Sequence, residues 1–325
     1  MGSAERILSA LAAHADEFVS GEALATTCGV TRSAVWKAIC ALRGAGYEIE
    51  AKTNAGYRLV GDVLDGAVIR SMLGDALAAR LTVETAGEVD STNLRVRERA
   101  SVGEAEGLVV AASSQSAGRG RMGRSFFSPD GSGLYFSVLL RPRSDAAASL
   151  AITTAAAVAV CRAIEATFGI DAGIKWVNDI FVGGRKVCGI LTEAALSVET
   201  GTLDYAVLGI GINVYEPASG FPPEIAEVAG ALISGERRPN ARNALLAAVL
   251  TEFFALYDRL VEKPQIEEYR RRCIALGRRV TVTSLACGDG REAVVEAITD
   301  DAALALRFDD GSRETLTSGE IRVRI

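Results

Sequence analysis

Histidine is almost absent from the sequence: His14 is the only one in 325 residues. A Ser-His-Asp or Cys-His catalytic system therefore lacks its base. The cysteines form no CxxC pair, so a zinc site is not expected. We expect small, buried, reduced thiols at Cys28, Cys40, Cys161, Cys188, Cys273 and Cys287.

A cationic leader and a long uninterrupted apolar run are also missing. Acidic Glu5 comes early and no cationic start precedes an apolar run, so no signal peptide is expected. The longest apolar stretch, Ala146–Cys161, is rich in alanine and interrupted by Ser149 and Thr153. It indicates a buried helix and not a membrane span. We therefore expect a cytoplasmic protein without membrane contacts.

The composition is that of a globular protein, with 49% hydrophobic and 23% charged residues. A chain of 325 residues is too long for one ordinary core, so we expect two or three domains. The net charge of −6 gives no overall sign of nucleic-acid binding. Any surface that binds DNA must be local.

Residues 1–62 have the pattern of a helix-turn-helix followed by a hairpin. Ser20 can cap a helix over 21–27, and Thr31 can cap a second helix that runs to Leu42 after a glycine-containing turn. Two short strands, at 48–52 and 58–60, follow. The sequence therefore predicts a winged helix.

One face of the second helix is expected to point outward and contact DNA. Residues 30–58 contain five basic and two acidic residues, five minus two giving a local charge of +3. Phosphate contact by this face and by the hairpin follows. The alternative is a winged helix that makes only protein contacts. The candidate DNA-binding residues are Arg32, Ser33, Trp36, Lys37 and Lys52.

Beyond a boundary at 62–66, long strands alternate unevenly with helices, which predicts an α+β fold with a mixed sheet. Strands are expected at 82–89, 107–113, 134–140, 173–182, 186–195 and 204–212, and helices at 67–79, 92–100, 146–168 and 241–262. After residue 273 short strands with glycine turns predict a small β-barrel. The expected domains are 1–62, 66–272 and 273–325.

The segment Gln115–Arg124 contains the densest chemistry. Its Gly118–Gly123 part fits GxGxxG, but Pro129 and further glycines follow where a dinucleotide fold needs a helix. What remains is a glycine loop with three arginines. Glycines let backbone N–H groups approach an anion, and guanidinium groups bind phosphate in a bidentate manner. The alternative is a solvated basic loop.

Two further clusters follow. Asp179 beside Asn178 can hold Mg²⁺ through oxygen or water, and Lys175 and Lys186 add positive charge. Asn213 ends a strand with two glycines, and glycine inside a strand often marks the close approach of a ligand. An asparagine can also pair with a purine edge.

Taken together, these pieces resemble the biotin protein ligase family in its repressor-bearing form, over nearly the whole chain. The resemblance rests on the ordered set and on no single motif. It lies in Ser20–Ala25, Thr31–Lys37, Asp90–Asn93, Gly118–Arg124, Lys175–Asp179, Lys186–Ile190, Gly209–Asn213 and Gly319–Ile321. Two departures are Val177, where the family often has proline, and Ser116, where it often has a second glutamine.

The resemblance implies a site for biotin and its adenylate at Ser91, Thr92, Asn93, Gln115, Arg119, Gly120, Arg121 and Lys186. Arg119, Arg121, Lys186 and Asp179 would act in catalysis, and Asp179 would contact Mg²⁺ through water. Lys175, Asn178 and Asn213 would bind ATP, with Asn213 at the adenine. The segment 215–237 would close over the nucleotide, with a contact from Phe221, and the C-terminal barrel would be SH3-like.

The implied activity is ATP-dependent formation of biotinyl-AMP and transfer of biotin to a lysine of a biotin carboxyl carrier protein. Operator DNA and a ligand-promoted homodimer are the other implied partners. The rival enzyme is a lipoate ligase. The rivals without ligase activity are a ligand-sensing transcription factor and a redox-sensing repressor that binds a dinucleotide.

Overall fold

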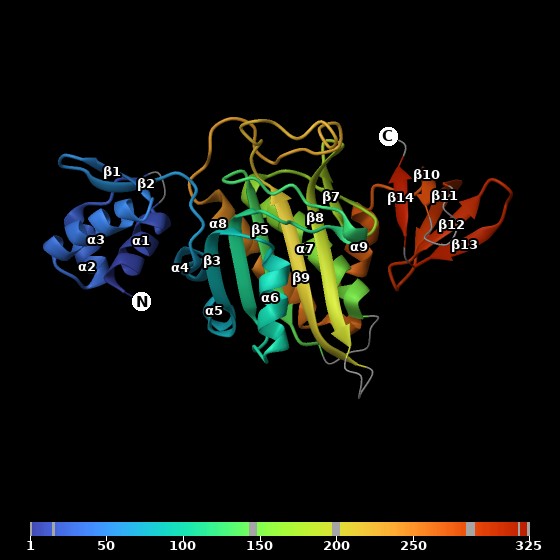
Figure 1. Ribbon diagram of the computed structural model, residues 1–325, viewed down its shortest axis with the longest axis horizontal. Helices are drawn as coiled ribbons and strands as arrows, with labels where there is room; N and C mark the ends of the chain where they lie inside the picture. Colours follow the sequence, from blue (N-terminus) through green and yellow to red (C-terminus); the bar gives the residue numbers. More distant parts are fainter. Residues whose placement is uncertain are drawn as a thin grey trace.

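The computed structural model describes residues 2–14, 17–142, 148–196, 202–283, 290–317 and 319–323. Three bodies follow one another along the long axis in chain order (Figure 1). They are an N-terminal helical module, a central mixed sheet covered by helices, and a C-terminal antiparallel sheet.

The N-terminal module contains the predicted helix-turn-helix and hairpin. Its elements are α1 (Ser3–Ala13), α2 (Gly21–Cys28), α3 (Arg32–Gly44), β1 (Glu48–Lys52) and β2 (Gly56–Val60). The Ser20 hydroxyl accepts a hydrogen bond from the Ala23 N–H at 3.0 Å, and Thr31 accepts one from the Ala34 N–H at 3.2 Å. Both predicted caps are therefore present, and they fix where α2 and α3 begin.

The central sheet has seven strands in the order β3-β4-β5-β9-β8-β7-β6. These are β3 (Thr82–Val89), β4 (Leu108–Gln115), β5 (Gly133–Leu140), β6 (Gly173–Lys175), β7 (Asp179–Val182), β8 (Arg185–Leu196) and β9 (Leu203–Asn213). The β3–β4 pair is parallel and the other pairs are antiparallel, as the α+β prediction requires.

Helices cover both faces of this sheet. Helix α6 (Thr92–Ser101) lies on one face, and α7 (Ala148–Phe168) and α8 (Ala241–Tyr257) lie on the other, with α9 (Ile266–Arg272) against α7 (Figure 1). Helix α7 is long and apolar enough to span a membrane, but 67% of its most apolar window is buried inside the protein. That burial is typical of a core helix.

Three predicted elements had wrong bounds. The helix expected at 67–79 is two, α4 (Gly66–Ser71) and α5 (Asp75–Arg80), because Gly74 starts a new helix as its N-cap. The strand expected at 173–182 is interrupted by a turn at Trp176–Asn178. The helix expected at 241–262 ends at Tyr257, before the single turn η2 (Leu260–Glu262). Helix α9 was not predicted.

The C-terminal sheet has the order β13-β12-β11-β10-β14. Its strands are β10 (Arg279–Thr283), β11 (Arg291–Ile298), β12 (Leu304–Phe308), β13 (Arg313–Leu316) and β14 (Glu320–Val323). Among the described residues no pairing joins β13 to β14, so the expected closed barrel is here an open sheet. The indole N–H of Trp176 donates to the carbonyl of Ala302 at 2.8 Å and ties this sheet to the central one.

The cysteines follow the prediction with one exception. Four described thiols are buried, but Cys40 is exposed on α3, and none of these five is in a disulfide. Cys287 lies outside the described residues.

Candidate active site

Two cavities meet at Phe126, over the middle of the central sheet. The larger holds about 140 Å³ and the smaller about 30 Å³. The side chains of Phe126 and Leu191 and the backbone of Gly189 line both. A ligand with one end in each cavity would therefore pass this ring.

The smaller cavity has a polar wall made by residues that the sequence analysis had selected. The N–H and hydroxyl of Thr92 donate to Oε1 of Gln115 at 2.9 and 3.2 Å. Nε2 of Gln115 in turn donates to the Ser128 hydroxyl at 3.0 Å. This cavity is lined by Ser91, Thr92, Asn93, Gln115, Arg119, Phe126, Gly189, Leu191, Gly209, Ile210 and Gly211.

Ser137 supports this wall from behind, and sequence reasoning missed it. The residue is completely buried on β5, with its hydroxyl 2.7 Å from Oγ1 of Thr92 and 2.6 Å from Oδ1 of Asn93. Nδ2 of Asn93 donates to Glu193 at 2.8 Å. A lone serine inside the apolar strand 134–140 was the available signal, because a buried hydroxyl needs a hydrogen-bond partner.

The strand glycines make room for the protein's own side chains. A Cβ added to Gly211 would lie 2.6 Å from the Phe126 ring, and one added to Gly189 would lie 3.0 Å from it. A Cβ on Gly209 would overlap the Asn93 amide. The sequence predicted the close approach of a ligand at Gly209 and Gly211, and the atoms that approach them in this structure belong to Asn93 and Phe126.

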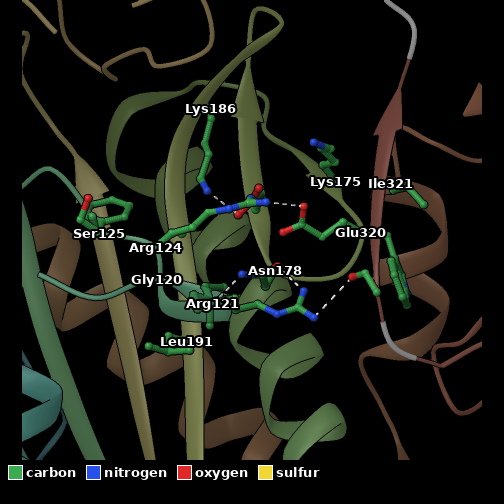
Figure 2. Close-up of a pocket in the computed structure, with 16 residues that line it drawn as sticks. Gly120, Arg121, Arg124, Ser125, Lys175, Asn178, Lys186, Leu191, Glu320 and Ile321 are labelled. Carbon is green, nitrogen blue, oxygen red and sulfur yellow. Dashed lines mark hydrogen bonds and ion pairs between the residues drawn. The ribbon is translucent and has the colours of Figure 1, made fainter. Parts of the chain in front are cut away.

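The larger cavity is lined by cations from three segments (Figure 2). Arg121 donates to Oδ1 of Asn178 at 3.0 Å and to the carbonyl of Gly319 at 3.5 Å. Nδ2 of Asn178 donates to the carbonyl of Ile190 at 2.7 Å, which fixes the amide. Arg121 is thus oriented by neutral oxygens, and no carboxylate among these partners neutralises its charge. The guanidinium can therefore pair with a bound anion.

The other cations in this cavity have acidic partners. Lys186 lies 2.7 Å from Oδ1 of Asp179, and Arg124 lies 2.7 Å from Glu320 of β14. Burial lowers the pKa of Lys175, Asp179 opposes that effect and Lys186 adds to it.

The larger cavity has a surplus of positive charge. Four basic and two acidic side chains line it, four minus two leaving two positive charges. Such a site favours a polyanion. Sequence reasoning did not select Arg124, Glu320 or Phe126 as site residues.

The arginine loop folds back on itself and does not start an α-helix. The N–H of Gly120 donates to the Arg124 carbonyl at 2.7 Å, and the N–H of Phe126 donates to the Gly118 carbonyl at 2.9 Å. A single 3-10 turn at Arg121–Gly123 and then strand β5 follow. This geometry agrees with the rejection of a dinucleotide-binding loop.

Asn213 and Phe221 line neither cavity. Asn213 ends β9 and its side chain donates to the carbonyl of Gly230 at 3.0 Å. The 215–237 segment is joined to β8 at Lys186, whose N–H donates to the Val228 carbonyl at 2.7 Å. The nucleotide roles of Asn213 and of Phe221 remain predictions.

The selected residues of the N-terminal module lie on an exposed face. Arg32, Ser33, Trp36 and Lys37 are exposed on α3, with Trp36 60% exposed, and Lys52 is exposed on β1. In the part of the chain that the structure describes, Arg32 and Lys37 form no ion pair. Their charges are therefore available to an anionic partner.

Comparison with known proteins gives consistent results for both modules. Residues 87–213 match the "Biotin/lipoate A/B protein ligase family" and residues 4–58 match the "HTH domain" family. The bifunctional ligase/repressor BirA of Escherichia coli is 31% identical over 313 residues, covering 95% of this chain and 94% of that protein. BirA of Bacillus spizizenii is 38% identical over 226 residues, 68% of each chain.

A solved structure has the same fold. The biotin protein ligase of Aquifex aeolicus in complex with biotin and ATP superimposes with a TM-score of 0.62 and 28% identity. The superposition covers 75% of this chain and 98% of the Aquifex aeolicus chain.

Proposed function

The chain belongs to the biotin protein ligase family in its bifunctional, repressor-bearing form, and from that premise we propose a two-step reaction. The protein joins biotin to AMP from ATP with release of pyrophosphate, and then transfers biotin to a lysine of a biotin carboxyl carrier protein with release of AMP. The observation that carries this proposal is the meeting of a polar-walled cavity and a cationic cavity at Phe126. A carboxylate in one thereby reaches a phosphate in the other.

In this proposal the smaller cavity binds the biotin ring. The ring's urea group offers N–H donors and a carbonyl acceptor, which suit the hydroxyls and amides of Ser91, Thr92 and Gln115. Asn93 is held by Glu193 and Ser137, and it supports the same wall. Arg119 and Gly120 then flank the carboxylate at the junction of the two cavities.

The adenylation step needs positive charge where two anions meet. The biotin carboxylate attacks the α-phosphate of ATP, the mixed anhydride forms and pyrophosphate leaves. Arg119, Arg121 and Lys186 stabilise the developing charge. Lys175 and Asn178 contribute to the ATP side of the cavity, and Asn213 meets the adenine with the 215–237 segment.

Asp179 fits a role near Mg²⁺, since one carboxylate plus water and substrate phosphates is a usual ligand set for this ion. Among the described residues no group of three or more His, Cys, Asp or Glu side chains could hold a metal by itself. When bound, Mg²⁺ would neutralise triphosphate charge. In the transfer step Asp179 orients or deprotonates the acceptor amine, and the ammonium of Lys186 lies 2.7 Å from its Oδ1.

The N-terminal module is proposed to bind operator DNA with α3 in the major groove and the β1–β2 hairpin as the wing. Arg32, Ser33, Trp36, Lys37 and Lys52 form the contact face. Adenylate would promote a homodimer that binds two half-sites. Footprinting with and without adenylate tests this role, and protection that does not depend on the ligand would contradict the switch.

The finer architecture is proposed along with the function. The domains are 1–62, 66–272 and 273–325, and the last, whose described strands form an open antiparallel sheet, contributes Glu320 to the site.

Biotin-dependent exchange of pyrophosphate into ATP tests the ligase proposal. We expect exchange with biotin and none with lipoate, followed by labelling of a carrier domain that streptavidin detects. Exchange with lipoate in place of biotin would identify a lipoate ligase. Failure of both substrates would leave a ligand-sensing transcription factor.

A further inference from the structure

The segment between the DNA-binding module and the ligase contains a buried carboxylate. The side chain of Asp62 is 0% exposed, and that of its ion-pair partner Arg242 is 4% exposed. A connecting segment usually runs over the surface, because buried polar groups must find partners. The burial of Asp62 therefore needs an explanation.

Within the described ranges, the partners of this carboxylate all come from the ligase. Nε of Arg242 lies 3.1 Å from Oδ2 of Asp62, and the backbone N–H of Arg242 donates to Oδ1 at 3.1 Å. The hydroxyl of Tyr215 donates to Oδ2 at 2.8 Å. A buried charge with an ion pair and several hydrogen bonds is compensated, and loss of one partner leaves the other uncompensated.

These partners extend to the proposed nucleotide end of the site. Nη1 of Arg242 donates to the carbonyl of Gly133 at 3.2 Å, and Gly133 pairs with Asn213 across β5 and β9. Tyr215 follows Asn213 by two residues and begins the 215–237 segment. Its N–H donates to the carbonyl of Ser132 at 2.7 Å.

The first turn of α8 also holds the N-terminal module. Nδ2 of Asn240 donates to the carbonyl of Ala12 in α1 at 3.0 Å. Nδ2 of Asn243 donates to the carbonyl of Val63 at 2.8 Å, and its Oδ1 accepts from the N–H of Asp65 at 3.0 Å. One helix end thus contacts the module, the linker and, through Arg242, the strand pair at Asn213.

We propose that Asp62 and Arg242 are positioning residues for nucleotide binding, supplied in part by the linker of the DNA-binding module. This proposal rests on the ligase function and deepens it. The Asp62–Arg242–Tyr215 cluster holds Asn213 and the start of the 215–237 segment in register, and leaves the biotin wall at Thr92 and Gln115 untouched.

The test compares Tyr215→Phe with wild type in the full-length chain, by biotin-dependent pyrophosphate exchange. Tyr215→Phe removes one hydroxyl and keeps the ring. We expect the KM for ATP to rise about tenfold, as for a lost hydrogen bond to a charged group. The KM for biotin should stay within about twofold.

Tyr205→Phe is the matched control, because Tyr205 lies at the end of β9 away from Asn213 and lines neither cavity. Among the described residues its hydroxyl makes no hydrogen bond to Asp62. It should change neither KM. Asp62→Asn is the stronger variant, and it is interpreted only if its thermal unfolding remains cooperative. Tyr215→Phe decides the question in either case.

This proposal would be overturned if Tyr215→Phe changed the KM for ATP and the KM for biotin equally. It would also be overturned if folded Tyr215→Phe changed neither KM. In both cases an active wild type would leave the ligase function intact. A wild-type protein without biotin-dependent exchange would contradict the ligase function itself.

Discussion

The basic side chains of the larger cavity and those of α3 differ in how they are held. In the cavity Arg121, Arg124 and Lys186 each have a partner oxygen within 3.0 Å. On α3, among the residues that the structure describes, Arg32 and Lys37 extend without an ion pair. The first arrangement suits one anion in one position, since preorganised charge needs no reorganisation during the reaction. The second suits a row of phosphates, where affinity comes from charge more than from geometry.

The cavity itself contains a finer contrast. Arg121 is held by neutral oxygens, whereas Arg124 is paired with the carboxylate of Glu320 and is more exposed. A guanidinium held without neutralisation has more charge to offer a bound phosphate. This difference sets the order of the effects expected from substitution.

The largest effect is expected from Arg121→Gly. Loss of this cation should lower adenylate retention by about 100-fold, as for removal of one preorganised donor. Released adenylate would then biotinylate bystander proteins. Adenylate dissociation and stray labelling are the measurements, with Arg124→Ala as the matched control. An effect of Arg124→Ala as large as that of Arg121→Gly would erase the distinction between the two arginines.

The next effect concerns the wall of the smaller cavity. Ser137→Ala should raise the KM for biotin about tenfold with kcat nearly unchanged, because Thr92 and Asn93 lose a buried partner. Steady-state kinetics at saturating ATP measure this. Ser113→Ala, on the neighbouring strand β4, is the control and should leave the KM for biotin unaltered. A fall in kcat alone would argue against a role in holding the wall.

A smaller effect is expected on α3. Lys37→Ala should weaken operator binding to all sequences alike and reduce the slope of log affinity against log salt by about 0.9 for one phosphate. Fluorescence anisotropy across a salt series measures this. Trp36→Ala is the comparison, since an apolar ring that contacts a thymine methyl affects specificity more than salt dependence. An unchanged slope for Lys37→Ala would place this lysine off the phosphates.

The smallest effect tests a carboxylate that is paired with an arginine far from either site. Glu165 has a lowered pKa, chiefly through its hydrogen bond from Arg272. Its contribution to stability is therefore present above the unfolded pKa of about 4.3 and is lost as the pH falls through the lower folded value. Because Glu165 is 36% exposed, we expect no more than about 1 kcal/mol. Urea unfolding at pH 7 and below pH 4 measures this. The free energies of unfolding of wild type and Glu165→Gln should differ at pH 7 and converge at the lower pH.

Local signals were sufficient for much of the fold. The caps at Ser20 and Thr31 act within three residues, so the sequence alone located α2 and α3. The motif residues Thr92 and Gln115 also come together as expected. Local signals could not predict the packing between segments that are distant in the sequence. The sequence predicted a domain boundary at 62–66, but not the burial of Asp62, because its partner Arg242 lies 180 residues further along the chain.

The same limit explains what was missed in the site. Ser137 and Phe126 carry no motif, and their importance comes from neighbours on other strands. Closure of the C-terminal barrel was inferred from strand number and turns, which do not determine whether the edge strands pair.

In the proposed binding mode, the Phe126 ring between the two cavities would also determine which ligand lengths fit. A molecule whose head rests against Thr92 must extend past Phe126 before its far end meets the cations, so a shorter tail would stop beside the ring and a longer one would crowd Arg121. Selection among carboxylic acids with the same head group would thus depend on how many methylene units separate head from acid.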